Sequence, residues 1–121
     1  MVIVESLKNV VEIDNVKYEY VYKLLESDYN FKNNEKCNSL KAYGIEVERK
    51  DTVKGQVVSN YKDFVRYISP KKEKVTEIIE LLNNNIVSPI HLIDVIGEYV
   101  DEYVNDFDEA IKNKNLKVAV L

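Results

Sequence analysis

The chain has 121 residues, about the length of one domain, and its 45% hydrophobic and 31% charged residues are proportions typical of a globular protein. Its formal net charge of −4 argues against a nonspecific nucleic-acid binder and against a basic protein of membrane surfaces. The single cysteine and single histidine exclude an intrachain disulfide and leave too few soft ligands for a zinc site.

The N-terminal residues lack the basic segment, the long apolar core and the small-residue cleavage site of a secretory signal. No apolar run approaches the roughly 20 residues of a membrane helix. We therefore expect one cytoplasmic domain over residues 1–121, with no membrane segment, no nucleic-acid partner and no cofactor.

The first 25 residues predict a β-hairpin. Apolar residues lead up to Asp14 and Asn15, which favour turns, and an alternating pattern resumes at Val16. Up to Leu24 the even positions are apolar or tyrosine, and most odd positions are charged. This period of two indicates a strand with one buried and one solvated face.

The next stretch, residues 26–39, is polar and rich in asparagine, and we expect it to be a long connection or a mobile excursion of the chain. Residues 40–50 return to strand character around Gly44, where glycine indicates a bulge or a close approach of two backbones. A turn ends at Gly55, and residues 56–68 predict one further strand or two short ones. The expected result is a meander of about four antiparallel strands over residues 2–68.

At Ser69-Pro70 the period changes to that of a helix, because serine favours the N-cap and proline the first helical position. An amphipathic stripe follows at helical spacing, made of Val75, Ile78, Ile79 and Leu82. We expect this first helix over residues 70–83. The three asparagines at 83–85 end it, since asparagine tolerates the left-handed cap conformation.

The same start signal recurs at Ser88-Pro89, and the apolar periodicity predicts a second helix over residues 89–112. Gly97 lies inside this helix, so close helix packing is expected there. Residues 116–121 have no helical caps and predict an extended tail. Strands followed by two helices with a short connection predict an α+β fold, with an antiparallel pair of helices packed on one sheet face.

Three segments, Tyr43–Val47, Tyr67–Pro70 and Val87–Ile96, are similar to a clostridial family of short uncharacterised proteins, classed as a domain of unknown function. The resemblance covers about residues 40–104. It implies a small cytoplasmic protein of anaerobic Firmicutes, and it implies no activity, cofactor or catalytic residue.

The second helix concentrates negative charge. Residues 1–87 hold equal numbers of acidic and basic side chains, so the whole net charge arises from residues 88–121. The candidate protein-binding residues are Asp94, Glu98, Asp101, Glu102, Asp106 and Glu109. Several follow one another at four-residue spacing, which places like charges side by side. Three interpretations are open: a docking surface for a basic protein, a solvated outer surface, or a weak site for a hard cation. The third lacks the loop of an EF-hand.

Lysines crowd the start of the first helix, where the helix dipole favours anions. One interpretation is a site for a small anion or a phosphorylated metabolite, with Ser69, Lys71, Lys72 and Lys74 as the candidate residues. The other is an intrachain charge match, in which an antiparallel second helix brings Asp106, Asp108 and Glu109 to these lysines.

No serine or cysteine has a spacing that implicates His91 as its base, and Cys37 lies in the polar stretch, so we predict a non-enzymatic protein. The short apolar segments Val2–Val4 and Leu116–Leu121 can pair with sheet edges, including those of a second copy in a homodimer. The leading hypothesis is a regulatory or adaptor domain that binds another protein through the acidic helix or a sheet edge. The alternative is an anion-binding domain at Ser69–Lys74.

Overall fold

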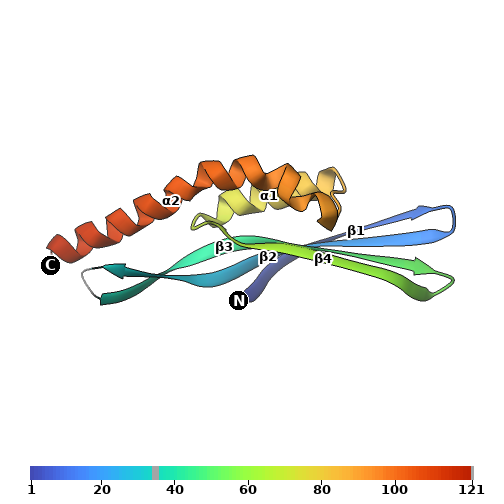
Figure 1. The fold of residues 1–121 in the computed structure, drawn as a ribbon, viewed down its shortest axis with the longest axis horizontal. Helices are drawn as coiled ribbons and strands as arrows, with labels where there is room; N and C mark the ends of the chain where they lie inside the picture. The colour runs from blue at the N-terminus through green and yellow to red at the C-terminus, as the bar shows by residue number, and fades with distance from the viewer. Residues whose placement is uncertain (34–35, 121) are drawn as a thin grey trace.

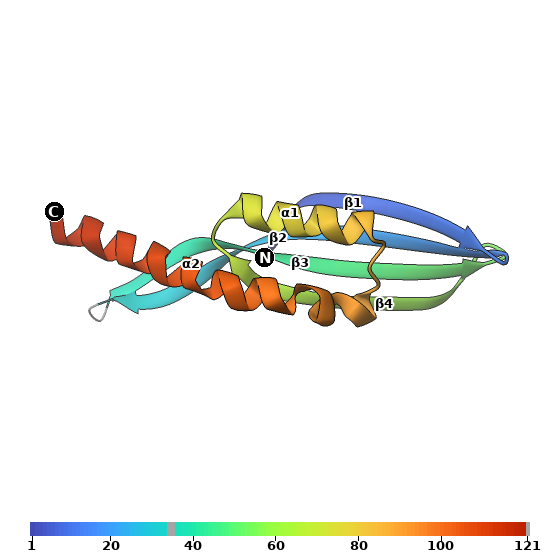
Figure 2. The ribbon, with the colours of Figure 1, turned by 90° about the horizontal axis from the view of Figure 1, so that it is seen from above.

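The structure is a computed structural model that describes residues 1–33 and 36–120. The elements in chain order are strands β1 (Val2–Ile13), β2 (Val16–Asn33), β3 (Lys36–Val53) and β4 (Gln56–Ser69), helix α1 (Lys72–Asn84), the 3₁₀ turn η1 (Pro89–His91) and helix α2 (Leu92–Val120). Figure 1 shows a long twisted sheet with α1 and α2 over the same side of it. From above, α1 lies toward β1 and α2 toward β4 (Figure 2). The predicted α+β class is confirmed.

The strands form one antiparallel sheet in the order β1-β2-β3-β4, as predicted for a meander of four strands. Two tight turns set the pairing. Asp14 and Asn15 have φ values of 51° and 66°, and Lys54 and Gly55 have φ values of 51° and 79°. Two consecutive left-handed residues are typical of the type I′ turn, whose twist matches that of the strands it joins. The predicted hairpin is confirmed, and β4 is one continuous strand.

The prediction of a long connection is wrong for residues 26–33 and 36–39, and residues 34–35 lie outside the described residues. β2 and β3 continue as a long hairpin, and their pairing extends as far as Asn33 opposite Lys36. Helix α2 covers this part of the hairpin, since the ring of Phe107 lies 4.9 Å from that of Tyr29. Backbone pairing and tertiary contacts here outweigh the low strand propensity of asparagine and charged residues.

The β2–β3 hairpin changes its buried side near its centre. The buried positions of β2 are even-numbered up to Leu24 and odd-numbered from Leu25, and those of β3 switch between Gly44 and Ile45. These residues lie opposite one another, so both strands rotate together. A Cβ at Gly44 would lie 2.1 Å from the carbonyl oxygen of Val65, which confirms the predicted close approach of two backbones at this glycine.

The core lies between the sheet and the helices. Its buried members are Tyr22, Leu24, Ile45, Val47, Ile68, Val75, Ile78, Ile79, Leu82, Leu92 and Ile96. The stripe predicted for the first helix is therefore confirmed. Tyr20, Tyr99 and Tyr103 pack against this cluster and are partly buried, as expected for tyrosines at a core edge. Direct packing of α1 and α2 as an antiparallel pair stays a prediction.

The predicted start of the first helix is wrong. Ser69 is fully buried at the end of β4, and α1 begins at Lys72 with Lys71 as its N-cap. The Ser69 hydroxyl accepts a hydrogen bond from the Lys71 amide at 3.0 Å, one residue before the helix. Ser69 does not cap α1, because it lies two residues before the N-cap, Lys71. Its own proton is donated to a carboxylate of α2, described below.

A Schellman motif closes α1 at its other end. The Val87 amide donates to the carbonyl of Leu82, and the Ile86 amide donates to that of Asn83. The left-handed residue is Ile86, with φ of 49°, and not one of the asparagines expected to end the helix. A β-branched residue is strained in this conformation.

Helix α2 is longer than predicted. The second start signal forms the 3₁₀ turn, and α2 then runs to Val120, so the prediction of an extended tail over residues 116–121 is wrong up to residue 120. Residue 121 lies outside the described residues. No glycine or proline follows Gly97, so no local signal stops the helix. The prediction of close helix packing at Gly97 is also wrong, because a Cβ there would meet no described atom within 4 Å.

Candidate functional site

A buried carboxylate joins β4, α1 and α2. Asp106 of α2 is only 8% exposed. Its Oδ2 accepts hydrogen bonds from the Ser69 hydroxyl at 3.0 Å and from Lys74 Nζ at 2.8 Å, and its Oδ1 lies 3.0 Å from the same Nζ. Lys71 Nζ lies 3.8 Å from Oδ1. The predicted charge match between the start of the first helix and the second helix is confirmed for Asp106.

Both partners of this ion pair are charged at neutral pH. Burial acts to raise the pKa of Asp106, but the hydrogen bonds from Lys74 and Ser69 and the charges of Lys74 and Lys71 hold it below its ordinary value. The hydrogen bond and the charge of Asp106 raise the pKa of Lys74. The ammonium of Lys74 also lies 4.6 Å from the ring centroid of Tyr103, a favourable cation–π geometry. The pair is a fixed structural link between α1 and α2.

Three of the four predicted anion-binding residues meet at this link. Ser69, Lys71 and Lys74 face the carboxylate of Asp106, so the protein's own anion takes their hydrogen bonds and charges. Lys72 lies apart, in a shallow groove along the outside of α1. An added anion would therefore have to displace Asp106 from its shortest hydrogen bonds.

A second polar cluster surrounds Arg49 on β3, and sequence reasoning missed it. Its Nε and Nη2 donate to the two carboxylate oxygens of Asp51 at 3.0 and 3.1 Å, and its Nη1 donates to Ser88 Oγ at 3.1 Å. The guanidinium lies 4.6 Å from the ring centroid of Tyr61. Burial opposes its charge, yet the bond to Asp51 raises the pKa of Arg49. Arg49 and Asp51 are odd-numbered, like the buried Ile45 and Val47 of β3. In a strand this spacing places all four on the same face, which was the available signal for this cluster.

The other candidate carboxylates lie on the outside of α2. The acidic face of α2 is defined here as the exposed residues Asp94, Glu98, Asp101, Glu102, Asp108 and Glu109. Asp106, which the sequence assigned to this surface, points inward instead. Among the side chains of residues 1–32 and 36–114, none of these six carboxylates has an ion-pair partner.

Exposed aliphatic side chains accompany the acidic face of α2. Ile90 of η1 is 66% exposed, and Ile93 and Val104 of α2 are 54% and 55% exposed. Ile93 and Val104 are about three helical turns apart, so they lie on one line along α2. This side of the molecule therefore offers both negative charge and apolar area.

The sheet face away from the helices has a different electrostatic character. Lys23 Nζ lies 3.1 Å from a carboxylate oxygen of Glu46, and Lys17 Nζ lies 2.9 Å from one of Glu19. Further pairs join Lys8 to Glu19, Lys23 to Glu48, and Lys62 to both Glu46 and Glu48. The charges of this face are thus matched within the chain, whereas those of the acidic face of α2 are not.

Residues 1–102 match a family model described as a family of unknown function, DUF6514. The chain belongs to this family. The match spans the sheet, α1 and the first part of α2, which is wider than the resemblance over residues 40–104. No curated protein and no solved structure matches the chain. The clostridial source and the cytoplasmic location implied by the resemblance stay predictions.

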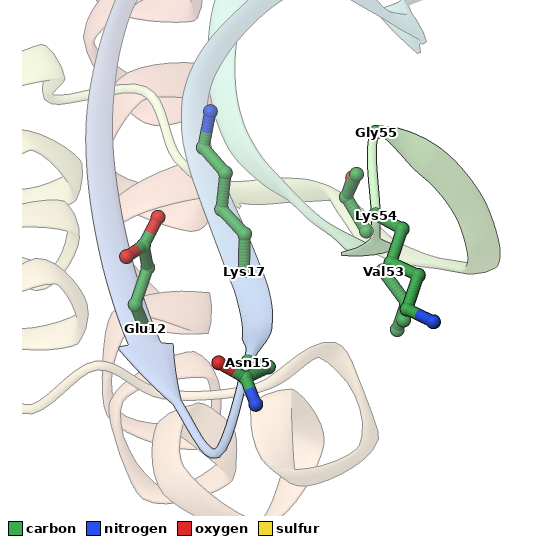
Figure 3. Close-up of a pocket in the computed structure, with 7 residues that line it drawn as sticks. Glu12, Asn15, Lys17, Val53, Lys54 and Gly55 are labelled. Carbon is green, nitrogen blue, oxygen red and sulfur yellow. The ribbon is translucent and has the colours of Figure 1, made fainter.

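An open hollow lies between the two hairpin turns of this DUF6514 chain (Figure 3). Its lining residues are Glu12, Asn15 and Lys17 from one hairpin and Thr52, Val53, Lys54 and Gly55 from the other. The hydrogen bond and charge of Glu19 raise the pKa of Lys17, so its amine stays protonated. The lining includes no histidine or cysteine. This hollow does not assemble a nucleophile with a base.

The single histidine and cysteine of the DUF6514 chain lie far apart. His91 is exposed in η1, just after Ser88, which bonds to Arg49 of β3, whereas Cys37 is exposed at the start of β3, opposite Lys32. Among the described residues, no group of three or more histidine, cysteine, aspartate or glutamate side chains is placed to hold a metal ion. No described helix is both long enough and apolar enough to span a membrane.

Proposed function

We propose that this protein is a non-enzymatic interaction domain that binds a basic surface of another protein through the acidic face of α2. The observation that carries the proposal is the contrast between two charged surfaces. On the open sheet face, lysines and glutamates pair with one another. On α2, six exposed carboxylates have no ion-pair partner in the described part of the chain.

The spacing of these carboxylates has an energetic consequence. Asp94, Glu98 and Glu102 follow one another at four-residue intervals, and like charges at this spacing destabilise a helix by about 0.2–0.5 kcal/mol per pair. Lysines or arginines of a partner relieve that repulsion on binding. Such charges mainly accelerate association, and the aliphatic side chains of Ile93 and Val104 add apolar contact.

We also infer that α1 and α2 lie as an antiparallel pair over the sheet. Lys74 near the start of α1 bonds to Asp106 in the second half of α2, and a connection of four residues, 85–88, separates α1 from η1. Two helices joined by a short connection run in opposite directions. In this arrangement the ion pair fixes the rotation of α2, with its acidic face turned away from the sheet.

A quantitative pull-down from the native host tests the proposed function. The test variant carries Asp101→Asn, Glu102→Gln and Glu109→Gln. The matched control carries Glu12→Gln, Asp14→Asn and Glu77→Gln, which neutralise three exposed carboxylates elsewhere. We expect the wild type and the control to retain a basic protein at low salt and to release it at high salt. The test variant should not retain this protein. Equal retention by the test variant refutes the proposal.

The alternative of an anion-binding domain at Ser69–Lys74 gains no support from the geometry. Asp106 already accepts the hydrogen bonds of Ser69 and Lys74. A thermal-shift screen with phosphorylated metabolites addresses it directly, and a stabilising hit that requires Lys74 would revive it.

A further inference from the structure

The outer edge of β1 is open and largely apolar. β1 pairs with β2 on one side, and the strand order places it at the edge of the sheet. Val2, Ile3 and Leu7 are 62%, 55% and 37% exposed. Natural proteins protect such edges with proline, lysine, β-bulges or very short strands. β1 is 12 residues long, has no proline, carries one lysine, Lys8, and has one register irregularity, between Ile3 and Glu5. The opposite edge strand, β4, carries both a lysine and an arginine.

We propose that β1 pairs antiparallel with β1 of a second copy of this chain, about a two-fold axis at Leu7. The two sheets then join into one continuous sheet with all four helices on the same side. The two-fold axis is perpendicular to the sheet, so residues directly opposite one another across it have their side chains on the same face of the sheet. Because side chains alternate between faces along a strand, the residue numbers of each opposed pair sum to an even value.

The charges along β1 favour this register over those centred on Glu5, Ser6 or Lys8. Centring on Leu7 sets the leucine opposite its own image, Glu5 opposite Asn9, and Ser6 opposite Lys8. Centring on Glu5 or on Lys8 would set two like charges directly opposite, which destabilises a strand pair. Centring on Ser6 would bury Glu5 against Leu7.

Helix α1 supplies independent charge complementarity. The Asn9 side chain donates to the Asn83 carbonyl, so these residues lie at the same level, and α1 and β1 run in the same direction (Figure 2). Thr76 lies about 10 Å before Asn83 along the helix, and Leu7 lies about 7 Å before Asn9 along the strand. An axis through Leu7 therefore passes close to Thr76.

The flank of α1 that faces the axis is charged with opposite signs at its two ends. Lys72, Thr76 and Glu80 recur every four residues and share the side of Asn83, while Lys74 faces α2 on the other side. They line the shallow groove outside α1. Rotation about an axis near Thr76 brings Lys72 of one copy toward Glu80 of the other. The surface is thus self-complementary in charge.

Sedimentation measurements on the full chain at up to about 100 µM test the dimer. We expect a dimer whose dissociation constant rises at least about tenfold in Leu7→Lys, because two ammonium groups then meet at the axis and apolar burial is lost. Val58→Lys, an exposed position on the other edge strand, is the matched control and leaves the constant unchanged. A wild-type monomer at all concentrations, or equal weakening by both variants, overturns the proposal.

A charge swap keeps the test independent of folding defects. Lys72→Glu and Glu80→Lys each place like charges across the axis and weaken the dimer, and the double variant restores it. The two residues are eight positions apart, about 12 Å along α1, so restoration cannot come from a contact within one helix. No restoration overturns the register. In a Cys37→Ser background, Leu7→Cys forms a disulfide with its own image, and Val58→Cys does not. The reverse result assigns the interface to β4.

Discussion

Replacing Asp106 by asparagine tests the role of the buried ion pair. Asp106 accepts three hydrogen bonds of 2.8–3.0 Å from Lys74 and Ser69. Breaking a fully buried ion pair costs about 3–5 kcal/mol, and a hydrogen bond to a charged group contributes about 1.5–3 kcal/mol. The Lys74 side chain is 31% exposed, so a stranded ammonium regains part of its hydration. Asparagine also keeps one carbonyl acceptor. The expected loss is about 2 kcal/mol in the free energy of unfolding.

Urea unfolding at pH 7 measures this loss, and a thermal scan should show a fall in Tm of roughly 8 °C for a domain of this size. The loss also depends on pH. The folded pKa of Asp106 lies below its unfolded value of about 3.9, so its contribution is complete above that value and disappears as the pH falls through the folded pKa. The stability gap between wild type and Asp106→Asn is therefore constant from about pH 7 to pH 5 and narrows below about pH 4.

Asp108→Asn is the control, because Asp108 is exposed on the same helix and should change stability by less than about 0.5 kcal/mol. A double-mutant cycle with Lys74→Met should give a coupling energy above about 1 kcal/mol. A loss below about 0.5 kcal/mol for Asp106→Asn, or a gap that stays unchanged down to pH 3, refutes the reasoning.

Three backbone positions give further predictions, each measured by urea unfolding. Gly44→Ala should destabilise the fold by about 3 kcal/mol or more, because the new Cβ lies 2.1 Å from the Val65 carbonyl oxygen; a loss below about 1 kcal/mol contradicts the close approach. Ile86→Gly should stabilise it by about 0.5–1 kcal/mol by removing left-handed strain, and a destabilised variant would show that the Ile86 side chain matters more. Gly97→Ala should add up to about 1 kcal/mol, since open space surrounds that position, and any loss would reveal a hidden contact.

The local part of the fold was predictable because each signal acts within a few residues. The Asp14-Asn15 turn is compatible with two left-handed residues, and the alternation from Val16 to Leu24 specifies one covered face. The apolar residues of α1 recur at a spacing that only a helix brings together on one face. These elements fold as their own sequences indicate.

The missed features depend on distant residues. The stretch over residues 26–39 has poor strand propensity, yet residues 26–33 and 36–39 are paired as strands, and Tyr29 contacts Phe107 of α2, 78 residues away in sequence. The switch of buried side at Leu24-Leu25 needs Gly44 and the backbone of β4, so the alternation of β2 alone cannot reveal it. The hydroxyl of Ser69 donates to a carboxylate of α2, and local capping rules, which consider only neighbouring residues, cannot indicate that contact.

Helical geometry explains how one acidic helix has both a buried ion pair and an exposed acidic face. Asp106 and Asp108 are two residues apart, which separates their side chains by roughly 200° around α2. One is therefore buried against Lys74, and the other is exposed on the acidic face. The inward carboxylate is neutralised within the chain and sets the rotation of the helix. That rotation then directs the six unpaired carboxylates outward together. If α2 binds a partner as proposed, loss of the Asp106 link should weaken that binding although Asp106 lies outside the acidic face, whereas neutralising the acidic face should weaken binding without loss of stability.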